Sequence, residues 1–271
     1  AIWGEAHDIN DAGQIVGSCG EHAVLWTPTT ARDGTGAMTD LGIPEGYDVS
    51  IAKAISSDAR IAGVAGTYDA AAYQPCVWSP GSTTAQVIDS TTNGDVRGVN
   101  NQGKVVGFVI AGGEEHACVW ESDGSDGYVA TDLDSIFPPA EIPGLPGNGT
   151  FWLREATAIN DNNQIVANGV YLEDADGDKY AEVVQYWGFL LEDPDNDGFH
   201  TGAIAVANLG ALGSRQYTFA NDINNLGQIV GASVGARNNQ GLHAVLWQDG
   251  VMQDLGTLPK EVSSRAFGIS D

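Results

Sequence analysis

The sequence predicts an all-β protein built from five four-stranded antiparallel repeats, followed by the first strand of a sixth. Three recurring patterns lead to this prediction. A segment like Ile/Val-Asn-Asp-x-Gly-Gln-Ile-Val-Gly opens each unit, one like His-Ala-Val-Leu-Trp follows, and one like Met-x-Asp-Leu-Gly closes it. The opening segment begins six times, with steps of 46, 44, 60, 64 and 46 residues, at Ile9, Ile55, Val99, Ile159, Ile223 and Ile269.

The first repeat shows how each unit gives four strands. Residues 5–9 and 14–18 flank an Asn-Asp-Ala-Gly turn, and Asn, Asp and Gly are the residues that accept left-handed backbone in hairpin turns. Residues 22–26 supply the third strand and residues 37–41 the fourth. None of these runs has helical periodicity over the length that a helix needs. One such sheet cannot bury both faces alone, so neighbouring repeats must stack.

A repeat length in the forties favours a β-propeller-like array over a solenoid, whose coils are usually about 20–30 residues long. We expect residues 1–271 to form a single repeat domain within a longer chain, because five units and one strand do not make a whole number of blades. The expected repeats are about 1–46, 47–90, 91–135, 154–213 and 214–259, with a partial unit at 260–271 and insertions at 134–153 and 172–202.

The three patterns together resemble the HAF repeat, found in predicted extracellular repeat proteins of bacteria and archaea. Residues 220–258 match best, through Asn224–Gly231, His243–Trp247 and Met252–Leu258. Repeat 2 departs most, since Ser56-Ser57-Asp58-Ala59 replaces the usual turn. The resemblance covers most of the chain outside the two insertions. It implies a secreted or cell-surface setting and no defined activity.

The composition is strongly acidic. The chain has 36 acidic and 11 basic residues, which give a formal net charge of −25. Such a charge repels nucleic-acid phosphates and anionic lipids, so neither is expected as a partner. No apolar run reaches the 18 or so residues that a membrane-spanning helix requires, so we expect no membrane insertion.

Several residues that could suggest catalysis recur once per repeat, which favours a structural role. His22, His116 and His243 share one position in the third strand. The segment Gly231–Gly235 fits the Gly-x-Ser-x-Gly pattern of hydrolases, but that motif requires a strand–turn–helix context and here follows a second strand. Another shared position near the end of the third strand is predicted to pack between sheets, and it holds Trp26, Trp78, Trp120 and Trp247.

The three cysteines are expected to be free thiols. Cys76 and Cys118 occupy the position that Val24 and Val245 fill in other repeats, which is typical of small buried hydrophobic residues. Equivalent positions in adjacent blades should lie too far apart for the Cα separation of about 5.5 Å that a disulfide needs. Cys19 follows a strand and lies in a loop.

Two acidic clusters in repeat 4 lie outside the repeat pattern and predict calcium sites. Both place carboxylates at alternate positions of a short loop, and the second has the Asp-x-Asp-x-Asp-Gly spacing of the first half of an EF-hand loop. Ca²⁺ takes six to eight hard oxygen ligands, which such a loop turns toward one point. The first predicted set is Asp174, Asp176, Asp178, the Tyr180 carbonyl and Glu182, and the second is Asp193, Asp195, Asp197 and the Phe199 carbonyl.

The positions of the two clusters exclude a dinuclear metal centre. The predicted strand 183–192 separates them. At about 3.3 Å per residue this strand spans roughly 30 Å, so the two ions should sit at opposite ends of the blade. A two-metal hydrolytic centre needs ions about 3.5–4 Å apart.

The function that we predict is a secreted or cell-surface, calcium-stabilised, non-catalytic repeat protein. It would mediate binding, adhesion or extracellular assembly, with a protein or polysaccharide of a cell surface or matrix, or further copies of itself, as partner. The alternative is a propeller-fold extracellular enzyme, a glycosidase or lyase, with its active site at the channel mouth. That enzyme would need a convergent set of off-pattern residues, for which Arg154, Glu155, His7 and His200 are the candidates.

Overall fold

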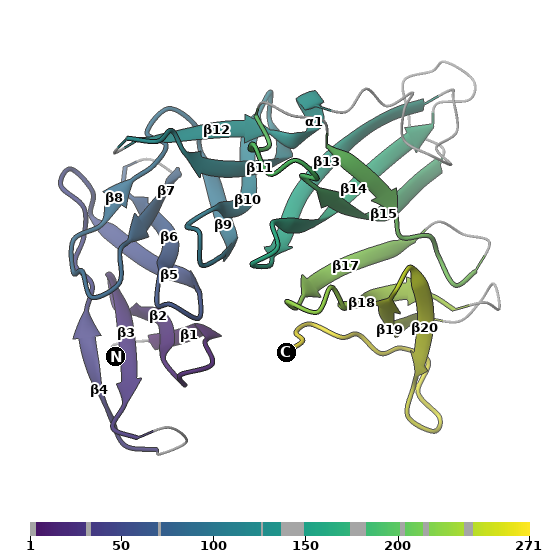
Figure 1. The fold of residues 1–271 in the computed structure, drawn as a ribbon, viewed down its shortest axis with the longest axis horizontal. Coiled ribbons are helices and arrows are strands. Elements are labelled where there is room, and N and C mark those ends of the chain that lie inside the picture. Colours follow the sequence, from purple (N-terminus) through teal and green to yellow (C-terminus); the bar gives the residue numbers. More distant parts are fainter. Residues whose placement is uncertain are drawn as a thin grey trace. The chain divides into compact units, whose positions relative to one another are not determined.

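The computed structural model describes residues 4–30, 34–69, 72–125, 127–136, 149–173, 183–200, 204–213, 217–235 and 241–271. The chain forms two compact units, Ala1–Ala130 and Thr131–Asp271. The described residues form five four-stranded antiparallel sheets and one short helix, which confirms the predicted all-β repeat architecture (Figure 1). Among the described residues, no helix has the length and apolar character needed to cross a membrane.

The first three repeats each form one sheet, with strands hydrogen-bonded in sequence order. The first sheet contains β1 (Gly4–Ile9), β2 (Ile15–Cys19), β3 (His22–Pro28) and β4 (Gly36–Asp40). The second contains β5 (Val49–Ile55), β6 (Ile61–Gly66), β7 (Tyr73–Trp78) and β8 (Gln86–Val87). The third contains β9 (Gly94–Val99), β10 (Val105–Ala111), β11 (Glu114–Ser122) and β12 (Tyr128–Asp132).

The fourth and fifth repeats follow the helix α1 (Leu133–Ile136). The fourth sheet contains β13 (Gly149–Ile159), β14 (Gln164–Glu173), β15 (Val183–Glu192) and β16 (Ala205–Asn208). The fifth contains β17 (Thr218–Ile223), β18 (Ile229–Val234), β19 (Leu242–Gln248) and β20 (Val251–Gly256).

A bulge in the first strand explains the glycine of the Gln-Ile-Val-Gly pattern. In repeat 2 the pairing of β5 with β6 shifts register between Ala52 and Ala54, and Gly63 lies opposite Ala52. A Cβ atom on Gly63 would stand 2.0 Å from the carbonyl oxygen of Ile51. The same approach recurs in repeats 1, 3 and 5, which explains their glycine, whereas repeat 4 has Ala167 at this place, opposite Ala156.

In repeats 2, 3 and 5 the recurring tryptophan joins the repeat to the one before it. The indole of Trp78 donates to the carbonyl of Leu41 at 2.8 Å, and that of Trp247 donates to the carbonyl of Leu209 at 2.9 Å. Trp120 donates instead to the Asp89 carboxylate at 3.5 Å. All three indoles are buried between sheets, as predicted. Burying an aromatic ring and satisfying its N–H together hold adjacent sheets in register.

Repeat 4 is longer than the others, and parts of both predicted insertions are strand. β13 begins at Gly149 rather than near residue 155, and β14 continues to Glu173. Apolar residues extend the pattern on one face, where Phe151, Tyr171 and Phe189 are buried. The rings of Phe151 and Phe189 pack edge to face with centroids 5.5 Å apart. This added apolar surface keeps the chain paired beyond the usual end of the repeat.

The cysteines are free, as predicted, but Cys19 is the last residue of β2 rather than a loop residue. Cys76 and Cys118 are buried in separate apolar clusters of the first unit. Burial raises the pKa of the Cys76 thiol, which makes that side chain a packing residue rather than a nucleophile.

Candidate functional site

The loop that follows β15 brings together the carboxylates of the second predicted calcium set. One ligand oxygen from each of Asp193, Asp195 and Asp197 lies within 4.8 Å of the others. Asp193 is buried at the end of the strand, while Asp195 and Asp197 are exposed. Within the described part of the chain this is the one group of acidic, histidine or cysteine side chains with such spacing.

The backbone of this loop is bent in the way that the sequence predicts. Asn196 and Gly198 have positive φ angles of 56° and 108°. The Gly198 amide donates to Oδ2 of Asp193 at 2.9 Å, which closes the loop onto its first carboxylate. Phe199 is completely buried, so the seventh loop position is anchored in the core. Asn163 of the neighbouring turn donates to Oδ1 of Asn196 at 2.6 Å.

The close approach of the three carboxyl groups changes the protonation of the loop. The hydrogen bond with Asp193, desolvation and the negative charge of Asp197 raise the pKa of Asp195 above its ordinary value. A carboxylate whose pKa rises beside like charges is one whose ionised form is destabilised. A divalent cation would reverse this effect, because it attracts all three carboxylates at once.

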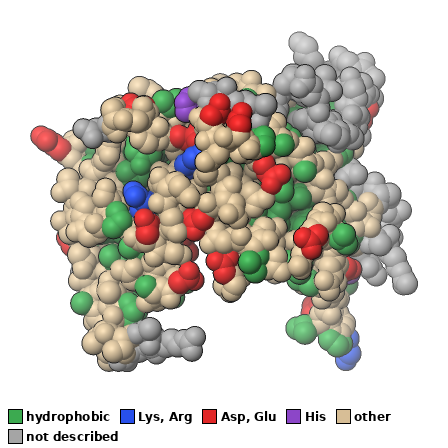
Figure 2. All heavy atoms as spheres, in the orientation of Figure 1, with side chains coloured by type: hydrophobic (Ala, Val, Ile, Leu, Met, Phe, Trp, Pro, Cys, Tyr) green, Lys and Arg blue, Asp and Glu red, His purple; other side chains and the backbone are tan. Residues whose placement is uncertain are grey.

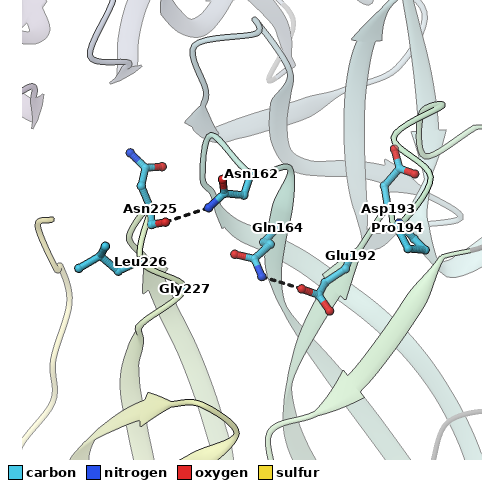
Figure 3. A pocket seen from close by; sticks show the side chains of 8 residues that line it. All are labelled: Asn162, Gln164, Glu192, Asp193, Pro194, Asn225, Leu226 and Gly227. Atoms are coloured by element: carbon cyan, nitrogen blue, oxygen red, sulfur yellow. Dashed lines mark hydrogen bonds between the residues drawn. The ribbon is translucent and has the colours of Figure 1, made fainter.

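A polar groove of about 430 Å³ begins beside Asp193 and runs to the turn of repeat 5. Figure 3 labels the eight residues that line it. Two hydrogen bonds order its walls. Asn162 donates to the carbonyl of Asn225 at 2.8 Å, and Gln164 donates to Glu192 at 2.6 Å. The groove therefore offers amide and carboxylate groups beside the apolar side chains of Pro194 and Leu226.

Part of the predicted site lies outside the described residues. The first calcium set, Asp174, Asp176, Asp178, Tyr180 and Glu182, falls within residues 174–182. Most of the proline-rich insertion, residues 137–148, also lies outside them.

The repeated histidines act within their own sheets in two repeats. Nδ1 of His22 lies 2.9 Å from Oδ1 of Asp40, and Nδ1 of His243 lies 3.0 Å from Oδ2 of Asp254. Each pair joins the His-Ala-Val strand to the Asp-Leu-Gly strand beside it. This pairing was missed by sequence reasoning, although both residues recur at fixed repeat positions.

The Asp40 pairing predicts a pH-dependent contribution to stability. Hydrogen bonds from the Gly42 amide and from His22 lower the pKa of Asp40 below 3.8. A carboxyl group whose pKa is lower in the folded state than in the unfolded state stabilises the fold at pH values above its ordinary pKa. This stabilisation is lost as the pH falls through the folded-state pKa. The Asp40→Asn variant should therefore lose less stability than the parent between pH 5 and pH 3. The difference should be under about 1 kcal/mol because the pair is exposed.

Urea unfolding at pH 7, 5 and 3 measures this difference. Glu45→Gln, at another exposed acidic position, is the control and should unfold with the parent's pH dependence. An Asp40→Asn variant that shows the same acid sensitivity as the parent would contradict the assignment.

Ser233 of the Gly-x-Ser-x-Gly segment is a buried strand residue. It lies within β18, is completely buried, and contacts Oγ1 of Thr218 at 3.1 Å. Its Oγ also accepts a hydrogen bond from the Leu212 amide at 3.0 Å. The described residues around it form no strand–turn–helix, so Ser233 serves the packing of repeat 5.

The surface reflects the composition of the chain. On the face shown in Figure 2, acidic side chains are spread over several sheets and few basic side chains accompany them. This excess of acidic side chains on the face shown agrees with the formal net charge of −25.

Comparison with known proteins shows the fold. No family model matches the chain. No curated protein matches it. A solved structure described as "putative TolB from Agrobacterium tumefaciens" is similar, with a TM-score of 0.53 at 12% sequence identity, over 97% of this chain and 85% of that one. TolB is a β-propeller, so the likeness supports a propeller-type repeat fold for this chain.

Proposed function

We propose that this chain is part of an extracellular, calcium-stabilised repeat protein that binds a partner rather than catalysing a reaction. The observation that carries the proposal is the convergence of Asp193, Asp195 and Asp197 on one point. The three carboxylates lie in a loop whose bend is fixed by Gly198. In binding proteins the residues that contact the partner commonly lie on surface loops held by a rigid scaffold.

The proposal places the five sheets as successive blades of a propeller of the HAF-repeat type. The tryptophan and asparagine contacts support this placement, because repeat 2 is joined to repeat 1 in the same way as repeat 5 is joined to repeat 4. The HAF resemblance supplies the extracellular setting. Such a setting also provides the calcium concentrations at which weak sites of about 10⁻⁴–10⁻³ M are filled.

The partner would be a protein or polysaccharide of a cell surface or matrix. The polar groove between the turns of repeats 4 and 5 supports this class of partner, since amides and carboxylates hydrogen-bond hydroxyl and peptide groups. The negative charge of the surface supports a partner that is neutral or basic rather than a nucleic acid.

Calcium binding gives the sharpest test. Binding of an ion to the folded state alone adds about 2.7 kcal/mol at a hundredfold excess over Kd. In a unit of this size that corresponds to a rise in melting temperature of about 5–10 °C, which EGTA should reverse. Asp195→Asn should abolish this rise by removing one carboxylate from the cluster.

Asp249→Asn is the matched control, because Asp249 is an exposed turn residue distant in sequence from the cluster. It should keep the full calcium response. Isothermal calorimetry that detects no calcium uptake at millimolar concentration would refute the site. So would an Asp195→Asn variant that responds to calcium as the parent does.

A further inference from the structure

Residues 264–271 contact repeat 5 in the way that the first strand of repeat 2 contacts repeat 1. Ser264 takes the place of Ser50. Its amide donates to the carbonyl of Leu242 at 2.7 Å, as the Ser50 amide donates to that of Glu21 at 2.9 Å. Its hydroxyl donates to the carbonyl of Gly256 at 2.5 Å, as that of Ser50 donates to the carbonyl of Gly42 at 2.7 Å.

The match continues to the end of the segment. The Ile269 amide donates to Oδ2 of Asp222 at 2.8 Å, as the Ile55 amide donates to Oδ2 of Asp8 at the same distance. The side chain of Asn224 donates to the carbonyl of Ser270 at 3.0 Å, which reproduces the Asn10–Ser56 contact. This segment therefore takes the position and register of a first strand.

The outer edge of this segment is exposed, unlike that of its counterpart. In repeat 2 the strand β6 covers β5, whose residues Ala52, Ala54 and Ile55 are buried. In the C-terminal segment none of their counterparts is buried, because Gly268 is exposed and Ala266 and Ile269 are partly exposed. The amides of Ser264 and Ala266 face repeat 5, so the intervening Arg265 amide faces the open edge, because donors alternate along a strand.

A second open contact lies on β20. Leu255 holds the position of Leu41, whose carbonyl accepts the indole of Trp78 from the next repeat. Leu41 is 1% exposed, whereas Leu255 is 49% exposed. The carbonyl of Leu209 accepts the indole of Trp247 in the same way. Repeat 5 thus exposes the leucine position whose carbonyl, in the equivalent interfaces, accepts a hydrogen bond from the tryptophan indole of the next repeat.

We propose that residues 264–271 and Leu255 form an acceptor surface for the second and third strands of a repeat of this same sequence type. The second strand would pair antiparallel with the segment, and the third would bring its tryptophan to the Leu255 carbonyl. This is β-strand addition, in which backbone hydrogen bonds give affinity and side-chain fit gives specificity.

The register fixes one sequence requirement of the incoming strand. In repeat 2 the residue opposite Ala52 is Gly63, and a Cβ atom there would meet the carbonyl oxygen of Ile51 at 2.0 Å. Ala266 and Arg265 hold the places of Ala52 and Ile51 in the segment. Repeat 4 has Ala167 at the equivalent place, so the strand that binds should have glycine or alanine opposite Ala266. An otherwise identical strand with a branched residue such as valine there should bind much more weakly, because its added atoms meet the backbone of the segment.

A peptide with the sequence of residues 226–248 is the probe, because it contains both strands and lacks cysteine. Titration calorimetry should show it binding the full chain. Peptides carrying Gly231→Val or Trp247→Leu should bind at least about tenfold more weakly, which is the loss that corresponds to 1.4 kcal/mol.

The matched receptor variants are Arg265→Pro and Arg265→Ala. Proline removes the outward amide while alanine retains it, so only Arg265→Pro should weaken peptide binding. Both variants should melt close to the parent in the absence of peptide, since this amide donates to no described residue.

A second arm places the hairpin on the same molecule. A chain extended after Asp271 by a copy of residues 226–256 should melt at a higher temperature than the same extension carrying Gly231→Val in the added copy. Equal binding of the parent and Gly231→Val peptides would overturn the proposal. So would the absence of peptide binding together with equal melting temperatures of the two extended chains.

Discussion

Replacing Gly63 with alanine is expected to destabilise the first unit by about 3 kcal/mol, at the upper end of the cost of overpacking. The added Cβ would stand 2.0 Å from the carbonyl oxygen of Ile51 and 3.0 Å from the Cα of Ala52. Both contacts are with backbone, so no rotamer change can relieve them. The bulge in β5 must shift, and with it the strand that packs against repeats 1 and 3.

Urea unfolding followed by the fluorescence of the buried Trp78 and Trp120 measures this loss. Gly4→Ala is the matched control, because its Cβ would meet its nearest neighbour, the carbonyl oxygen of Ser18, at 3.3 Å. Neither glycine has a positive φ angle, so the comparison isolates the steric contact. Similar costs for the two variants would show that the bulge is not the reason for glycine in this motif.

Asn160→Ala is expected to destabilise the second unit by about 3 kcal/mol, through the loss of several buried hydrogen bonds. The side-chain amide of Asn160 donates to the carbonyl of Asn224 at 2.9 Å and to Oε1 of Gln164 at 2.7 Å. Its Oδ1 accepts from the amides of Gln164 and Asn162, both at 3.0 Å. One buried side chain thus closes its own turn and joins repeat 4 to repeat 5.

Thermal and urea unfolding of the variant test this expectation. Asn162→Ala, an exposed position in the same turn, removes one hydrogen bond and should cost about 1 kcal/mol or less. Asn160→Asp keeps both acceptor contacts and loses both donors, so it should remain strongly destabilised if the contact with Asn224 matters. An Asn160→Asp variant as stable as the parent would restrict the role of Asn160 to its own turn.

The sequence by itself determined the elements and their order. The Asn-x-x-Gly turns, the short runs of alternating apolar residues and the three repeated patterns are local signals, and local signals decide where a strand begins and a hairpin turns. The expectation of a bent acidic loop after the third strand of repeat 4 was also local, because Asp-x-Asp-x-Asp-Gly sets both its charge and its flexible point. These features needed no knowledge of neighbouring repeats.

Only the tertiary structure decided why particular residues recur. The repeated asparagine, tryptophan and aspartate contact the following or preceding repeat, as Asn10 contacts Ser56, Trp78 contacts Leu41 and Asp8 contacts Ile55. The groove beside Asp193 is likewise formed by residues about sixty positions apart. Such contacts depend on how the sheets stack. The sequence pattern shows that a residue recurs, but it does not show which backbone group of a neighbouring repeat that residue contacts.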